Sequence, residues 1–189
     1  GGKQIKPTLV DRIQDRYGKT IFRHEERTCD GCNANAWANQ EEPVLADNRE
    51  QVLDPMTAYQ VTSMLEGVVI RGSAAGKIHI KDRPIAGKTG TTNDSKDTWF
   101  VGFSPDLVAG LYIGFDNPAS LGRGATGGGL AAPIFADFME TAEKTRDAGK
   151  FQVPQGMQFI AVNRKTGMFA NEGEPDTIGE AFQPGTGPA

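Results

Sequence analysis

The amino-acid sequence predicts an α+β fold in which an antiparallel sheet is covered by packing helices. Three strand-like stretches follow one another between residues 83 and 115, and the last two are rich in aromatic and β-branched residues. Two segments with the apolar spacing of helices flank them, one opening at Pro55 and the other at Pro133. Helices packed on an antiparallel sheet form one of the few stable layered arrangements, and this order of elements favours it.

The sequence of residues 5–50 predicts a hairpin followed by a loop. Residues 5–22 hold two strand-like pieces around the turn-forming run Asp15-Arg16-Tyr17-Gly18, which indicates a β-hairpin. Residues 25–50 are polar and irregular, so we expect a surface loop there.

Capping residues and apolar spacing predict the two helices. Asp54 can cap the first helix and Pro55 suits its first turn, with an end expected near Gly72. The second helix starts at Pro133. The expected apolar positions are Met56, Tyr59, Met64, Leu65 and Val68 in the first helix and Ile134, Phe135, Phe138, Met139 and Ala142 in the second, where Asp137, Glu140, Glu143 and Lys144 are expected to face water.

The strands expected between the helices span residues 83–91, 98–103 and 107–115. Ser104-Pro105-Asp106 is a turn signal, so the last two strands should form an antiparallel hairpin. The glycine-rich residues 122–129 are expected to form a flexible connector between the last strand and the second helix.

The residues after Gly149 carry weaker signals. Most of this region is expected to be irregular, with a short hairpin around residues 158–162 and 165–167. The closing "EAFQPGTGPA" has the composition of an extended tail.

Composition narrows the class of protein. The 189 residues suggest one domain or a piece of one, and 38% apolar with 23% charged residues are typical of a globular chain. The net charge of −4 and a pI near 5.2 argue against nucleic acid as a partner. No apolar run approaches the length of a transmembrane helix. The chain begins at Gly1 without methionine, so we expect it to be cut from something longer.

The run Lys88-Thr89-Gly90-Thr91-Thr92 combines a cation, hydroxyl side chains and a glycine, which suits either a phosphate cradle or an acyl-transfer site. A P-loop requires a glycine at position 82, where the chain has Asp82, and it opens a helix, whereas residues 97–103 alternate like a strand. The acyl-transfer interpretation is therefore favoured, since Lys-Thr-Gly is one of three elements of serine penicillin-recognising enzymes.

Three longer stretches of the sequence resemble a known family, and this resemblance is more specific than the three-residue motif alone. The pieces "RPIAGKTGTTND", "DTWFVGFSPDLVAGLYIGFD" and "TGGGLAAPIFADFM" resemble the C-terminal half of the transpeptidase domain of a class A penicillin-binding protein, the bifunctional peptidoglycan synthase. The resemblance implies a β-lactamase/transpeptidase-like α+β fold. It assigns residues 1–149 to the C-terminal portion of that domain and residues 150–189 to an extension and tail.

The resemblance also implies roles for the motif residues. Lys88 and Thr91 match catalytic positions, and Thr89, Gly90 and Thr91 match substrate-binding positions. Lys88 would hold positive potential over the cleft, and the Thr91 N–H would form half of an oxyanion hole. Strand alternation puts Thr89 and Thr91 on one side, where both hydroxyls can donate to the carboxylate of a peptide or a β-lactam. Gly90 would keep the strand edge bare.

Two motifs of the family are absent from the sequence. None of the five serines begins a Ser-x-x-Lys or a Ser-x-Asn motif. The resemblance therefore implies part of a serine D,D-transpeptidase whose nucleophile lies in a missing N-terminal part of the same protein, with a glycosyltransferase domain and an inner-membrane anchor. We expect this chain alone to be inactive.

Partners and alternatives follow from the same resemblance. The expected partners are peptidoglycan stem peptides and β-lactam antibiotics, in the periplasm or cell envelope, with no metal and no cofactor. The alternatives are a relative of D-alanyl carboxypeptidases or β-lactamases, or a non-catalytic structural or interaction fragment. The block "TWFVGFSPDLVAGLYIGFD" favours the synthase family.

The pair Cys29 and Cys32 leaves four interpretations open: a local disulfide, half of a zinc site, a thioredoxin-like redox pair, or two free thiols. A zinc site would need two more ligands, and the chain has only His24 and His79 as histidines. An oxidising cell-wall compartment would favour a disulfide that staples the loop.

Overall fold

The computed structural model of the chain describes residues 1–24, 36, 38–39, 47–145 and 149–188. The chain divides into two compact units, residues 2–54 and residues 55–189. The cysteine pair and most of the loop expected over residues 25–50 lie outside the described residues.

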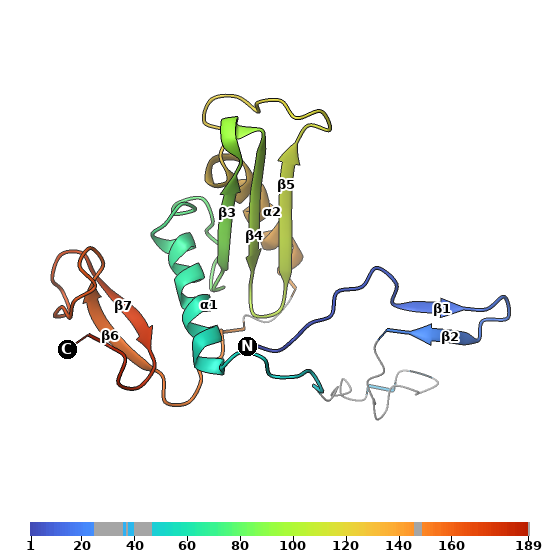
Figure 1. Cartoon of the computed structure of the whole chain (residues 1–189), viewed down its shortest axis with the longest axis horizontal. Coiled ribbons are helices and arrows are strands. Elements are labelled where there is room, and N and C mark those ends of the chain that lie inside the picture. The colour runs from blue at the N-terminus through green and yellow to red at the C-terminus, as the bar shows by residue number, and fades with distance from the viewer. Residues whose placement is uncertain (25–35, 37, 40–46, 146–148, 189) are drawn as a thin grey trace. The chain divides into compact units, whose positions relative to one another are not determined.

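The smaller unit contains the predicted hairpin. Strands β1 (Arg12–Gln14) and β2 (Thr20–Arg23) pair antiparallel, with Ile13 opposite Phe22 (Figure 1). The Asp15 carboxylate closes the turn by accepting from the N–H groups of Tyr17 and Lys19 at 2.9 and 3.0 Å. This is a common way for aspartate to stabilise a turn, and it explains why the turn lies where the sequence predicts.

The larger unit is built on a three-stranded antiparallel sheet in the order β3-β4-β5 (Figure 1). The strands span Ala86–Thr91, Asp97–Phe103 and Val108–Gly114, close to the predicted bounds. A 3₁₀ turn, Asn93–Ser95, joins β3 to β4. The predicted proline turn joins β4 to β5, where the Leu107 carbonyl accepts from the Ser104 N–H at 2.9 Å.

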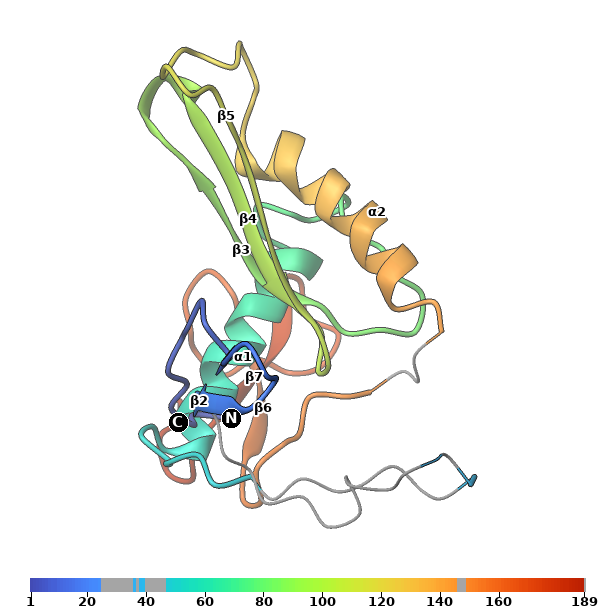
Figure 2. The same ribbon diagram turned by 90° about the vertical axis from the view of Figure 1, so that its right-hand side faces the viewer.

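One helix precedes the three strands of this sheet in the chain and another follows them, as the sequence predicts. Helix α1 spans Pro55–Ile70 and helix α2 spans Ala132–Ala142, and α2 lies along one face of the sheet (Figure 2). The rings of Phe100 on β4 and Phe135 on α2 lie 4.6 Å apart and are almost fully buried. Burying one such side chain contributes about 1.5–3 kcal/mol, so this contact anchors α2 to the sheet.

The predicted faces of α2 are partly wrong. Phe135 and Met139 are buried as expected, but Ile134 and Phe138 are 44% and 54% exposed. Glu143, expected to face water, is fully buried at the end of the helix because Arg83 and Ser104 provide hydrogen bonds to its carboxylate. The apolar spacing along a helix does not indicate these partners, since they come from other elements.

The glycine-rich connector also differs from the expectation. Residues Gly127–Ala131 form a π-helical turn that leads into α2, and Gly127 and Gly128 are buried. The turn packs against β3 and β4, so these residues are a fixed part of the unit and not a flexible connector.

The C-terminal residues form a hairpin on α1. Strand β6 (Gln158–Asn163) pairs antiparallel with β7 (Thr177–Phe182), so the expected tail begins with a strand. The turn near residues 165–167 exists, but it lies within the connection between the two strands. Tyr59 of α1 meets Phe159 of β6 edge to face with ring centroids 6.1 Å apart, and this contact joins the hairpin to the helix. The domain boundary expected after residue 149 stays a prediction.

In the part of the chain that the structure describes, no helix is long and apolar enough to cross a bilayer.

Candidate active site

The Lys-Thr-Gly motif lies on an edge strand. In the described part of the larger unit, β3 pairs with β4 on one side only. The Thr92 N–H donates to the Asp97 carbonyl at 3.0 Å, and the register continues without a bulge through Gly90 opposite Trp99. Because successive residues of an antiparallel strand turn their backbone groups to opposite sides, the N–H groups of Thr89 and Thr91 point to the open edge.

The side chains of the two threonines share a face of the sheet, as the sequence predicts. Thr89 lies opposite Phe100 and Thr91 lies opposite Thr98, and both partners are fully buried. Thr89 itself is half-buried, and Thr91 is exposed. The motif threonines therefore stand where the buried face of the sheet meets its open edge.

Lys88 projects from the other face of the strand and is exposed. Its Nζ donates to the carbonyl of Thr89 at 2.9 Å. That carbonyl points to the open edge for the same reason as the Thr89 N–H, so the hydrogen bond holds the ammonium along the edge. An exposed cation and outward-pointing N–H groups together suit the binding of an anionic, extended peptide.

Both threonine hydroxyls have partners inside the unit. Thr91 Oγ1 accepts from the Gly127 N–H at 2.9 Å, and Thr89 Oγ1 lies 2.7 Å from Ser73 Oγ. Sequence reasoning did not assign Ser73 or Gly127 to the site. The "TGGG" stretch signalled a special backbone near Gly127, whereas nothing local signals Ser73, because the contact joins residues sixteen positions apart.

The glycines of the π-helical turn are needed for this contact. A Cβ on Gly127 would lie 2.4 Å from the Trp99 carbonyl oxygen and 2.6 Å from that of Gly90. A Cβ on Gly128 would lie 2.1 Å from the Ser73 carbonyl oxygen. Only residues without a side chain can approach the motif strand this closely, and the turn therefore supports β3 from behind.

Aromatic side chains cover the exposed face beside Gly90. Trp99, directly opposite Gly90, packs on Tyr112 with ring centroids 4.8 Å apart. The Tyr112 hydroxyl donates to the Asp97 carboxylate at 2.9 Å, and this hydrogen bond to an anion raises the pKa of the tyrosine. The absence of a side chain at Gly90 leaves the Trp99 ring open beside the motif.

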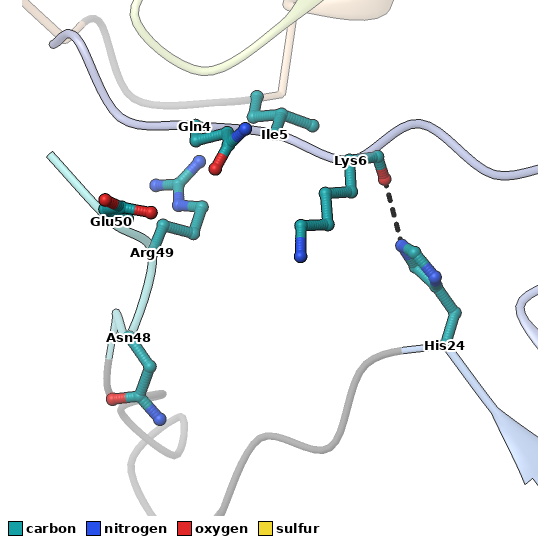
Figure 3. Close-up of a pocket in the computed structure, with 7 residues that line it drawn as sticks. All are labelled: Gln4, Ile5, Lys6, His24, Asn48, Arg49 and Glu50. Atoms are coloured by element: carbon teal, nitrogen blue, oxygen red, sulfur yellow. Dashed lines mark hydrogen bonds between the residues drawn. The ribbon is translucent and has the colours of Figure 1, made fainter. Parts of the chain in front are cut away.

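A separate hollow of about 500 Å³ lies in the smaller unit (Figure 3). Lys6, Arg49 and Glu50 line it with charges of both signs, and His24 Nε2 lies 2.9 Å from the Lys6 carbonyl oxygen, to which it donates. None of the motif residues lines this hollow. In the described ranges, no group of three or more histidine, cysteine or acidic side chains is placed to hold a metal ion.

A family model and the sequences of known proteins match this chain to the same family. Residues 1–140 match the model of the penicillin binding protein transpeptidase domain. The chain is 45% identical over 185 residues to penicillin-binding protein 1A of Rickettsia bellii and 38% identical over 157 residues to that of Neisseria gonorrhoeae. These matches cover 97% and 83% of this chain but 23% and 18% of the relatives, so the chain spans about a quarter of their length or less.

A solved structure shows the same fold. The crystal structure of penicillin-binding protein 1A from Haemophilus influenzae superposes with a TM-score of 0.71 at 29% identity, over the whole of this chain and 30% of that one. The transpeptidase-like α+β fold expected from the sequence is thereby confirmed. The edge strand with Lys-Thr-Gly, helix α2 packed on the neighbouring strand β4 and the match over residues 1–140 together establish that the chain belongs to the penicillin-binding protein transpeptidase family.

Proposed function

We propose that the chain supplies one wall of the acyl-transfer cleft of a serine D,D-transpeptidase, which cross-links peptidoglycan stem peptides and is acylated by β-lactams. The open edge of β3 is the observation that carries the proposal: it directs the Thr91 N–H outward beside the ammonium of Lys88. Membership of the transpeptidase family supports the same chemistry.

The nucleophile in this proposal is a serine of a Ser-x-x-Lys motif, which the printed sequence does not contain. It belongs to the N-terminal part of the same longer protein, together with a Ser-x-Asn motif. The serine oxygen bonds to the carbonyl carbon of the terminal peptide bond, and the carbonyl oxygen takes up negative charge. The Thr91 N–H stabilises that charge as one donor of an oxyanion hole.

The acyl-enzyme then forms and is consumed. The bond from the carbonyl carbon to the leaving nitrogen breaks, and that nitrogen takes the proton lost by the serine. The amine of a second stem peptide attacks the ester, which restores the serine and creates the cross-link. A β-lactam follows the first half of this path through its ring amide, and no acceptor amine releases it.

Lys88, Thr89 and Gly90 bind the substrate in this scheme. The charge of Lys88 attracts the terminal carboxylate and assists the proton relay around the serine. The hydroxyls of Thr89 and Thr91 donate to the same carboxylate. Gly90 adds no side chain to the strand edge, so a peptide backbone can lie close to it.

The longer protein is proposed to carry a peptidoglycan glycosyltransferase domain and a membrane anchor, and to work in the cell envelope. The proposed chemistry uses no metal and no cofactor, since acyl transfer here needs only a serine, a base and oxyanion donors. The relatives are named penicillin-binding protein 1A, which supports a penicillin-binding role for the whole protein.

A D,D-carboxypeptidase or β-lactamase relative is the second candidate, because both share Lys-Thr-Gly. Such an enzyme would pass the acyl group to water and release a shortened peptide or a hydrolysed β-lactam. A non-catalytic fragment would do neither. The identity to penicillin-binding proteins 1A over nearly the whole chain favours the transpeptidase.

Penicillin labelling tests the proposal. The longer protein, incubated with a fluorescent penicillin and run on a denaturing gel, should carry a covalent label. The 20.3 kDa chain alone should carry none, because it lacks Ser-x-x-Lys. An unlabelled longer protein would contradict the proposed function, and a labelled 20.3 kDa band would show that the nucleophile lies within this chain.

A further inference from the structure

Ser73 touches the motif strand although it lies outside the motif. Its Oγ is 2.7 Å from the Thr89 Oγ1, and it is supplied by the turn that follows α1. The two hydroxyls are exposed on the side of β3 from which the threonines project. The proposed acyl-transfer steps assign no role to this serine.

The backbone at Ser73 is held in place from two directions. The N–H groups of Gly72 and Ala74 both donate to the Val68 carbonyl at 3.2 Å, which ties the turn to the end of α1, and Ala74 is fully buried. The Ser73 carbonyl approaches Gly128 so closely that a Cβ there would lie 2.1 Å from it. Ser73 is therefore presented to Thr89 by packed structure on both sides.

Binding of a carboxylate requires the hydroxyl hydrogens of the motif threonines to point toward it. An ionised carboxylate only accepts hydrogen bonds, so a threonine that binds it must donate its single hydroxyl hydrogen. Thr91 Oγ1 already accepts from the Gly127 N–H, which leaves its own hydrogen available for a ligand. The Thr89 hydroxyl hydrogen is likewise available for a ligand only if Ser73 donates to Thr89 Oγ1.

We propose that Ser73 is a positioning residue of the cleft: it donates to Thr89 Oγ1 and so aims the Thr89 hydrogen at the carboxylate of the stem peptide or β-lactam. The inference rests on the proposed function and deepens it, because it names a residue outside the motif that sets carboxylate recognition. The relay from Ser73 through Thr89 to the carboxylate is a chain of hydrogen bonds, in which each bond polarises the next.

The test compares a penicillin with its carboxyl methyl ester, which cannot present an anion. Second-order acylation constants are measured for both compounds on the longer protein and on Ser73→Ala. We expect Ser73→Ala to slow acylation by the free acid roughly two- to tenfold, the effect of one hydrogen bond, and to leave acylation by the ester unchanged. Ser73→Thr, which retains a hydroxyl, should restore most of the rate with the acid.

Ser120→Ala is the matched control, because Ser120 is an exposed serine whose hydroxyl accepts from the Gly122 N–H and belongs to no part of the site. It should leave both constants unchanged. If Ser73→Ala does not fold, Ser73→Cys keeps the size of the side chain with a weaker donor and is measured in the same way.

The outcomes separate positioning from a purely structural role. An equal loss with acid and ester would overturn the proposal, since the serine would then support the fold and not the carboxylate. An unchanged constant for the acid would also overturn it. If the unsubstituted longer protein is not acylated at all, the proposed function fails and this inference fails with it, which is distinguishable from a failure confined to Ser73.

Discussion

At the scale of single residues, Thr91 shows how one position can serve two tasks. Its hydroxyl oxygen accepts from the Gly127 N–H inside the unit, while its own N–H points to the open edge of β3. A substitution of the side chain therefore leaves the proposed oxyanion donor in place. Lys88 differs, because its whole contribution lies in the side-chain charge.

This difference predicts an order of effects in the longer protein. Lys88→Ala should remove a charged hydrogen bond worth about 1.5–3 kcal/mol, which corresponds to roughly ten- to more than a hundredfold in acylation rate. Thr91→Val should cost less, because its N–H survives. Second-order acylation constants by a penicillin measure both. Lys96→Ala removes another exposed lysine and should have no effect. A Thr91→Val defect equal to that of Lys88→Ala would show that the roles are assigned wrongly.

Gly127 allows a second prediction at this scale. Its Cβ would lie 2.4 Å from the Trp99 carbonyl oxygen, so Gly127→Ala forces the turn away from β3. Overpacking of this kind costs about 1–3 kcal/mol. Urea unfolding of the purified protein should show the loss. In Gly110→Ala, the control on β5, the added Cβ meets only Val101 Cγ2 at 3.7 Å and should cost much less. Equal stability of the two variants would contradict the close contact.

At the scale of elements, a buried carboxylate joins three of them. Glu143 at the end of α2 accepts from Arg83 Nη1 at 3.0 Å, ahead of β3, and from the Ser104 hydroxyl in the turn between β4 and β5. Arg83 also donates to the Glu143 carbonyl at 2.7 Å. The network ties the helix to the sheet that carries the motif.

Breaking this network should destabilise the unit strongly. Glu143→Ala removes the carboxylate that accepts from Arg83, whose side chain is only 12% exposed. Removing one partner of a buried pair costs about 3–5 kcal/mol. Glu140→Ala, at an exposed position of the same helix, should change stability little. Denaturant midpoints for both variants measure the difference, and similar midpoints would show that the network contributes nothing.

At the scale of the whole molecule, carboxylates whose pKa is shifted make the stability of the folded chain depend on pH. Asp176, between β6 and β7, has a lowered pKa, chiefly because Lys165 forms a hydrogen bond to it and also because Arg164 is close. A lowered pKa stabilises the folded chain above the ordinary aspartate pKa, and this stability is lost as the pH falls through the lowered value. Burial raises the pKa of Glu66 on α1, which acts in the opposite direction.

Asp176→Asn should therefore destabilise the protein near pH 6 and lose that effect as the pH approaches the lowered pKa of the wild-type carboxylate. Urea midpoints across the acid range measure this. Asp137→Asn, at an exposed position of α2, is the control. A difference between wild type and Asp176→Asn that stays constant with pH would mean that the ion pair does not stabilise the fold.

Much of the larger unit could be predicted because its signals are local. The start of α1 follows from Pro55, which suits the first turn of a helix, and β4 and β5 follow from alternation around the proline turn. The C-terminal strand β7 was missed. Its sequence lies among glycines and prolines, and it is ordered by pairing with β6 and by contacts such as that of Gln60 Nε2 with the Ala181 carbonyl at 2.9 Å.

The sequence by itself determined the family, because long stretches such as residues 98–116 resemble it. It also determined the motif strand and the side on which Thr89 and Thr91 stand, because strand alternation depends only on neighbouring residues. The tertiary structure alone decided that Ser73 and Gly127 support those threonines and that Glu143 is buried. The physical reason is the same in each case. A hydrogen bond or a close approach between distant segments depends on how whole elements pack, and no local pattern of residues encodes that distance.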